Sequence, residues 1–180
     1  MTAQRSPGMR RNIELKARLR DPAEARGVAE RLATANAGPQ QQIDTYFHCR
    51  HGRLKLRQID GLSAMLIAYH RPDQSESKGS DYLLTPVANP ETLKQTLASA
   101  LGLWVVVEKR REVYWWNNVR IHLDEVVGLG AFLEFEAVLD ADHDDRSGHM
   151  QLARLSGEFG IQPADLVEGS YSNLLIAIAR

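Results

Sequence analysis

The feature that most constrains the fold is a strict alternation of charged and apolar side chains in several short segments. Arg53, Lys55 and Arg57 alternate with leucines, and Glu134 and Glu136 alternate with apolar residues. The same period of two recurs in residues 12–19, 103–116 and 119–126. This period places successive side chains on opposite faces of a β-strand. The sequence therefore predicts strands with one apolar face and one densely charged face.

Turn and capping signals divide the rest of the chain. Hairpin turns are predicted at residues 60–61, 117–118 and 128–130, which join the alternating segments into antiparallel pairs. Asp21 and Asn89 precede prolines that suit the first position of a helix. Helices are predicted over residues 22–35, 90–101, 150–159 and 171–178, and an acidic loop over 140–148. The length of 180 residues fits one domain, 1–180, whose residues 1–10 are expected to form a flexible tail.

The charged faces need an explanation, because an ordinary sheet does not carry such dense charge. If the helices cover the apolar face, the sheet can close with its charges pointing inward. This predicts an α+β fold, a closed antiparallel β-barrel around a charged tunnel with helices outside. The alternative is a set of two-sided strands whose polar faces are simply solvated. The predicted lumen holds Lys16, Arg18, Arg53, Lys55, Arg57, Lys109, Arg111 and Arg120 against Glu14, Asp124, Glu134 and Glu136.

In this lumen the basic side chains outnumber the acidic ones. Confined like charges without a partner are costly, so we expect a polyanion to neutralise the bases. The carboxylates favour a hard divalent cation, Mg²⁺ or Mn²⁺, which prefers oxygen ligands and bridges to phosphate oxygens. Polyphosphate together with a metal ion satisfies both requirements.

Composition excludes several other classes of protein. Hydrophobic residues make up 43% and charged residues 25%, the balance of a globular protein. The formal charge of -1 argues against a nucleic-acid or membrane-surface partner. No apolar run is long enough for a signal peptide or membrane span, which predicts a cytoplasmic location. Cys49 is the one cysteine, and no P-loop motif is present.

Other chemistry-bearing groups carry a weaker signal. The cluster of His48, Cys49 and His51 lacks a fourth ligand for a soft metal. An acidic segment with two histidines is expected to be solvated surface, and the tryptophans are expected to pack against helices. These residues are His143, Asp144, Asp145 and His149, and Trp104, Trp115 and Trp116.

The ordered set of motifs resembles the CYTH family, the triphosphate tunnel enzymes that include class IV adenylate cyclases, thiamine triphosphatases and inorganic tripolyphosphatases. Residues 12–16, Asn-Ile-Glu-Leu-Lys, resemble the family's Glu-x-Glu-x-Lys signature, and residues 54–57 resemble its basic Lys-x-Arg strand. Arg71 and Lys78 fit the next basic positions. Residues 120–136 resemble the cyclase-type branch in particular. The resemblance implies a tunnel of about eight antiparallel strands.

The resemblance also implies roles for individual residues. The implied metal ligands are Glu14, Asp124, Glu134 and Glu136, and the implied catalytic residues are Glu14, Lys16 and Lys78. The implied phosphate-binding residues are Lys16, Lys55, Arg57, Arg71, Lys78, Lys109, Arg111 and Arg120. Asn12 departs from the pattern, because it stands where the family has the first glutamate, and an amide is a weaker ligand for a hard cation. One metal ion or two therefore remain open.

Three functions follow as hypotheses. In the first, a water attacks a metal-bridged triphosphate and the chain is a hydrolase of a triphosphate-containing small molecule. In the second, the 3'-hydroxyl of ATP attacks and the chain is a class IV-type adenylate cyclase, which also requires a base pocket. In the third, Asn12 marks a non-catalytic binder of polyphosphate or nucleotide. The oligomeric state, including a homodimer, is left open.

Overall fold

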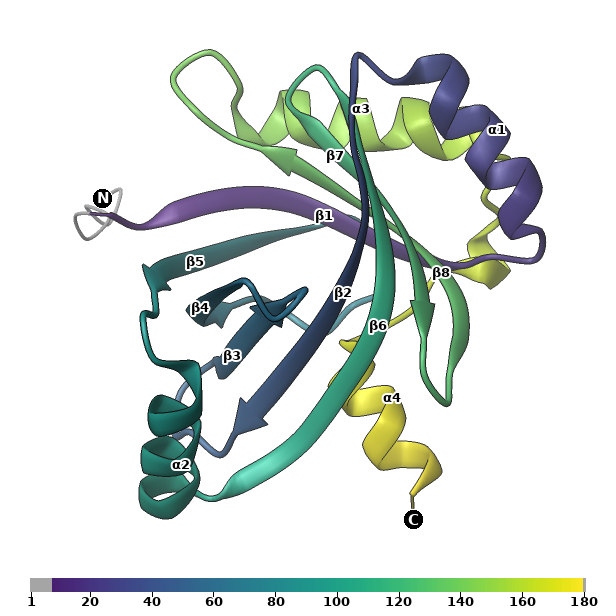
Figure 1. The fold of residues 1–180 in the computed structure, drawn as a ribbon. Helices are drawn as coiled ribbons and strands as arrows, with labels where there is room; N and C mark the ends of the chain where they lie inside the picture. The colour runs from purple at the N-terminus through teal and green to yellow at the C-terminus, as the bar shows by residue number, and fades with distance from the viewer. Residues whose placement is uncertain (1–7, 180) are drawn as a thin grey trace.

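The strands form one closed antiparallel barrel. The structure, a computed structural model, describes residues 8–179. Around the ring the strands follow the order β1-β5-β4-β3-β2-β6-β7-β8, and β1 pairs with β8 to close it (Figure 1). The predicted α+β fold, a closed antiparallel barrel with helices outside, is confirmed.

The strands predicted over 103–116 and 119–126 and the helices predicted over 90–101 and 171–178 lie within those bounds in the structure. The strands are β1 (Arg10–Arg18), β2 (Ala35–Phe47), β3 (Arg53–Ile59), β4 (Ser63–His70), β5 (Lys78–Pro86), β6 (Leu103–Trp116), β7 (Val119–Val126) and β8 (Gly130–Val138). The helices are α1 (Pro22–Leu32), α2 (Pro90–Leu101), α3 (Asp145–Glu158), the short 3₁₀ helix η1 (Pro163–Asp165) and α4 (Tyr171–Ile178). Within residues 8–179, no helix has both the length and the apolar composition needed to cross a membrane.

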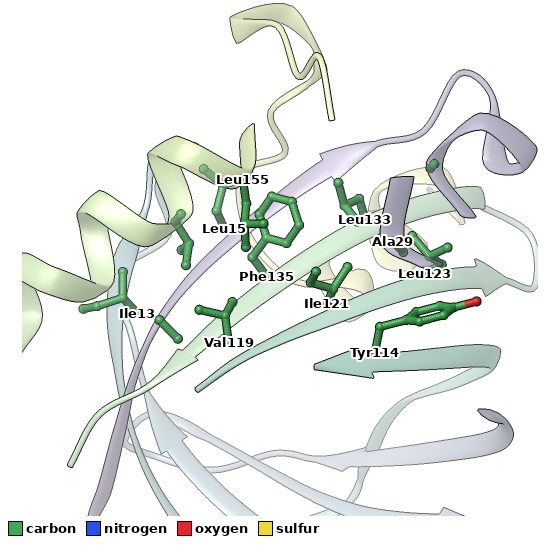
Figure 2. Packing of buried hydrophobic residues seen from close by; sticks show 13 residues of the cluster. Ile13, Leu15, Ala29, Tyr114, Val119, Ile121, Leu123, Leu133, Phe135 and Leu155 are labelled. Atoms are coloured by element: carbon green, nitrogen blue, oxygen red, sulfur yellow. The ribbon is translucent and has the colours of Figure 1, made fainter. Parts of the chain in front are cut away.

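The apolar face of the sheet lies outside the barrel, where α1 and α3 cover it (Figures 1 and 2). Ile121 of β7 and Leu133 and Phe135 of β8 are fully buried beneath these helices. Leu152 of α3 and Ala29 of α1 complete the same cluster. Burying one such large side chain stabilises the fold by about 1.5–3 kcal/mol. The outward apolar face leaves the charged faces to point inward, as the alternation predicted.

Two predicted boundaries were wrong. The helix predicted over 22–35 ends at Leu32, and its last residues instead open β2, which pairs with β6 from Ala35 onward. The loop predicted over 140–148 is half helix, because Asp144 caps α3 by accepting from the Ser147 N–H at 2.8 Å. Gly148, the last residue of that predicted loop, lies in α3 and permits close packing, since a Cβ there would lie 2.7 Å from Ile13.

The N-terminal strand begins earlier than the sequence predicted. Residues 1–7 of the expected tail lie outside the described residues, and β1 already includes Arg10. Arg11 ties this strand to its surroundings, because its guanidinium contacts Asp81 and Asp145, each at 2.7 Å. These ion pairs favour an ordered strand over a tail at this position.

Outside the barrel, a carboxylate on β6 anchors α1. Glu112 accepts from Arg26 at 2.8 and 2.9 Å, and Arg110 and Tyr114 also donate to it. The Arg26 hydrogen bonds lower the pKa of Glu112 to about 2, against the opposing effect of burial. Its ordinary pKa in an unfolded chain is about 4.3. The stabilisation is therefore complete above that value and is lost as the pH falls towards 2.

We expect Glu112→Gln to lower the free energy of unfolding by about 2 kcal/mol at pH 7, because it weakens hydrogen bonds to a charged group. The difference from the native protein should shrink at pH 3 and vanish near pH 2. Urea denaturation followed by tryptophan fluorescence at pH 7 and pH 3 measures it. Glu108→Gln, at an exposed position of the same strand, is the control. Equal differences at both pH values would contradict the assignment.

Candidate functional site

The register of the strands brings basic and acidic side chains together inside the barrel. Across the β1–β8 pair, Glu14 lies opposite Glu136 and Lys16 opposite Glu134. Across the β7–β8 pair, His122 lies opposite Glu134. Antiparallel partners on one face lie within contact distance of each other. The register therefore places Glu14, Lys16, Glu134 and Glu136 in one lumen, and His122, which was not among the predicted lumen residues, lies beside them.

The lumen contains a cavity of about 120 Å³ to which every strand contributes. Its lining is mainly polar and charged, with tyrosines between the charges. The residues are Asn12, Glu14, Lys16, Tyr46, Lys55, Arg57, Ile67, Tyr69, Arg71, Ser80, Tyr82, Leu84, Lys109, Arg120, Glu134, Glu136, Ser170 and Tyr171. Lys78 and Arg111 are buried nearby, at 2% exposure each.

Asp44 is a central residue of the lumen that the sequence did not reveal. Its carboxylate accepts two hydrogen bonds from Arg57, both at 2.7 Å, and contacts Lys55 at 2.9 Å and Lys109 at 3.3 Å. Burial would raise the pKa of Asp44, but the field of Arg57 overcomes it and holds the pKa well below its usual value. The expectation of uncompensated bases was thus wrong for these three cations. The signal was weak because Asp44 follows three glutamines rather than alternating with other charges.

A second buried cluster surrounds Arg111. Its guanidinium donates to both oxygens of Asp124, at 2.6 and 2.5 Å, and to Glu134 at 2.6 Å. The hydroxyl of Tyr171, at the start of α4, donates to Asp124 at 2.7 Å. The Tyr171 ring also lies 3.8 Å from Lys16 Nζ, a cation–π contact. The role of Asp124 in metal binding stays a prediction, since both of its oxygens accept from side chains here.

The other predicted carboxylates form ion pairs along the tunnel. Lys16 contacts Glu134 at 2.6 Å, Arg120 contacts Glu136 at 3.2 Å, and Arg71 pairs with Glu14. Burial would raise the pKa of Glu136, but the charge of Arg120 lowers it to about 2. The charges of Lys16 and Arg111 likewise hold the pKa of Glu134 well below its usual value, against the effect of burial. Glu134 and Glu136 are therefore ionised at neutral pH, the state in which a carboxylate ligates a cation.

Two lysines of the site have depressed pKa values. Burial lowers the pKa of Lys109 to about 7, although the charge of Asp44 opposes the shift. Burial, together with Arg71 and Lys16, lowers the pKa of Lys78 to about 8, and its amine donates to the Gln74 carbonyl at 2.5 Å. Both amines can therefore exchange a proton near neutral pH.

His122 lies against the β8 carboxylates. Its Nδ1 is 3.7 Å from Glu134 Oε2 and 4.0 Å from Glu136 Oε1, and the side chain is 4% exposed. Burial and the charge of Arg111 lower the pKa of the imidazole. One ligand atom from each of the three residues lies within 4.8 Å of the others. This donor set fits a divalent cation, because it offers carboxylate oxygens and a neutral nitrogen.

Several predicted positions lie outside this lumen. Arg18 is exposed, 5.0 Å from the Phe132 ring, and Arg53 pairs with Asp73 at 2.6 Å. Asn12, by contrast, lines the cavity; it is buried, and its Oδ1 has no hydrogen-bond partner. Within the described part of the chain, the His122 cluster is the one group of three metal-ligating side chains whose ligand atoms lie within 4.8 Å of one another.

The predicted packing of the tryptophans against helices is seen for Trp116, whose ring lies 5.0 Å from the Arg154 guanidinium of α3. Trp104 lies edge-on to Tyr46 with ring centroids 6.1 Å apart, and Trp116 packs against the core cluster beneath α1 and α3. The Trp115 ring lies 5.6 Å from the Arg120 guanidinium.

Fold and lumen together define a tunnel barrel that carries buried cations and carboxylates on its inner face. The sequence matches the CYTH domain over residues 10–171, and the chain belongs to that family. A search of proteins with curated functions found no match. The family resemblance is thus confirmed.

Solved structures share this fold. PH1012 from Pyrococcus horikoshii is 24% identical, with a TM-score of 0.80 over 91% of this chain and 98% of its own. A candidate adenylate cyclase from Vibrio parahaemolyticus is 19% identical, with a TM-score of 0.76 over 92% and 97%. HpAC1 from Hippeastrum, a candidate adenylyl cyclase with a dominant triphosphatase activity, is 16% identical. Its TM-score is 0.65 over 94% of this chain and 96% of its own.

Proposed function

We propose that the chain is a divalent-metal-dependent enzyme that binds a triphosphate in its tunnel and hydrolyses a phosphoanhydride bond. The observation that carries this proposal is the closed lumen in which eight strands place cations beside Glu14, Glu134 and Glu136. Phosphoryl transfer depends mainly on positioning and charge neutralisation, which such a lumen supplies.

In this proposal the cations bind the phosphate oxygens. When substrate binds, its phosphate oxygens replace the Asp44 carboxylate as the partner of Lys55, Arg57 and Lys109. The carboxylate and the phosphate compete because they accept from the same donors. Arg71, Arg111, Arg120, Lys16 and Lys78 complete the phosphate-binding set. Lys78, with its pKa of about 8, is positioned to accept or return a proton during the reaction.

The proposed metal ligands are Glu14, Glu134 and Glu136, with Asp124 as a further candidate and Mg²⁺ or Mn²⁺ as the ion. When bound, the ion neutralises charge that develops on the transferring phosphate. Lys16, which contacts Glu134 at 2.6 Å, orients this carboxylate. Glu14 approaches the ion from β1, next to Glu136 on β8, and pairs with Arg71.

A second candidate function is adenylate cyclisation. A second cavity of about 420 Å³ shares Tyr46 and Arg71 with the lumen and is lined also by His48 and Trp104. It offers space and an aromatic surface for a nucleobase beside the phosphate-binding cations. The same cavity could instead hold the organic part of another triphosphate. A third candidate, a non-catalytic binder, is favoured by Asn12.

We further propose that the partner is a small molecule rather than nucleic acid or a membrane, because the formal charge is only -1. The cytoplasmic location stays a prediction from the sequence. A homodimer is compatible with this proposal.

Product analysis tests the proposed function. Purified protein is incubated with tripolyphosphate, ATP or thiamine triphosphate, each with Mg²⁺ and with Mn²⁺, and the products are resolved by chromatography. We expect release of orthophosphate that depends on the metal. Cyclic AMP with pyrophosphate would establish the cyclase instead, and binding without turnover in every mixture would establish the non-catalytic binder.

A further inference from the structure

His122 is the one group of the lumen's metal-ligating cluster that is not a carboxylate. It projects from β7 towards Glu134, its register partner on β8, and towards Glu136. The family signature that assigned the carboxylates gave this histidine no role. The role of His122 therefore depends on the hydrogen bonds and charges around its imidazole.

The Nδ1 atom of His122 is buried and has no hydrogen-bond partner. Most buried polar side-chain atoms are hydrogen-bonded, and leaving one unsatisfied costs about 1–3 kcal/mol. A histidine with a purely structural role would be expected to satisfy this nitrogen. The carboxylate oxygens of Glu134 and Glu136, at 3.7 and 4.0 Å, are too distant for hydrogen bonds.

Glu134 and Glu136 do not need His122 as a counterion. Glu134 already contacts Lys16 and Arg111, and Glu136 already contacts Arg120. The Nδ1 atom of His122 faces both carboxylates. When the ring carries its proton on the other nitrogen, Nδ1 directs a lone pair to the space between them.

We propose that His122 ligates the same divalent ion as Glu134 and Glu136, which makes the site a mixed nitrogen and oxygen site that prefers Mn²⁺ or Co²⁺ to Mg²⁺. An imidazole nitrogen suits transition ions, whereas Mg²⁺ favours oxygen ligands alone. Each carboxylate has lone pairs enough to ligate the ion while it keeps its basic partner. The inference rests on the proposed function only in taking this lumen to be the metal site.

Pulsed EPR of the Mn²⁺-loaded, full-length protein tests the proposal without substrate. We expect ¹⁴N coupling from a bound imidazole in the native protein and its loss in His122→Gln. We also expect His122→Gln to weaken Mn²⁺ binding by about tenfold or more, and Mg²⁺ binding much less. His51→Gln, at an exposed position outside the lumen, is the matched control and should retain the coupling.

Circular dichroism of His122→Gln establishes that the variant is folded, and His122→Asn replaces it if it is not. Absence of ¹⁴N coupling in the native protein, or its persistence in the folded variant, would overturn the proposal, as would failure to bind Mn²⁺. Coupling without turnover of any triphosphate would uphold the nitrogen ligand and reject only the proposed hydrolase. Turnover without coupling would do the reverse.

Discussion

Glu136→Gln is expected to lower the metal-dependent kcat/KM for the hydrolysed triphosphate by about 10²–10³-fold. The change removes the charge of a carboxylate in the candidate metal cluster while it keeps the shape of the side chain. The side chain of Glu136 is 17% exposed and that of its ion-pair partner Arg120 is 27% exposed, so water can solvate the arginine that remains. The fold should therefore survive the substitution.

Initial rates across a Mn²⁺ titration, with thermal unfolding of each variant, measure this effect. Glu125→Gln, at an exposed position of β7, is the matched control and should retain native rates. An unchanged rate for folded Glu136→Gln would remove Glu136 from the proposed site. Glu134→Gln is a poorer test, because it leaves buried Lys16 and Arg111 with less compensation and so also affects stability.

Asp44→Asn is expected to have the largest effect on stability, a loss of about 3–5 kcal/mol in the free energy of unfolding. Asp44 contacts Lys55, Arg57 and Lys109, and its own side chain is 1% exposed. An amide retains hydrogen-bonding capacity but not the charge. The variant therefore leaves a cluster of cations in a confined space without their counterion.

The same variant tests whether the cations bind phosphate. Metal-free tripolyphosphate should raise the melting temperature of Asp44→Asn more than that of the native protein, because it need not displace a carboxylate. Thermal unfolding with and without the anion measures this difference. Asp142→Asn, on an exposed loop, controls for the loss of one negative charge. A smaller rise in Asp44→Asn than in the native protein would contradict competition between Asp44 and the anion.

The sequence predicted the architecture because a period of two records which face of a strand each side chain occupies. It thereby assigned Glu14, Lys16 and Glu134 to one lumen before any pairing was known. Alternation does not record which strands are neighbours. The contact between Asp44 and Arg57 depends on the β2–β3 register, which no local pattern contains.

Two further features of the site depend on distant parts of the chain. Tyr171 reaches Asp124 from a helix, where a strand pattern gives no signal. Arg18 follows the alternation but is exposed. The alternation predicts towards which face of the strand a side chain points, but not how far along the barrel axis the residue lies. The position of Gly148 in α3 reflects its contact with β1, which outweighs the low helix propensity of glycine.

Closure of the ring by β1 and β8 also determines when the site can form as the chain folds. β1 is made first, yet one of its partners, β8, lies more than a hundred residues later in the chain. The Glu14–Glu136 and Lys16–Glu134 neighbours exist only across that seam. During synthesis β1 cannot pair with β8 until β8 has been made, and such long-range pairing is slow. Metal-ligand assembly is thus coupled to ring closure, so the complete site cannot act as a template for the early stages of folding.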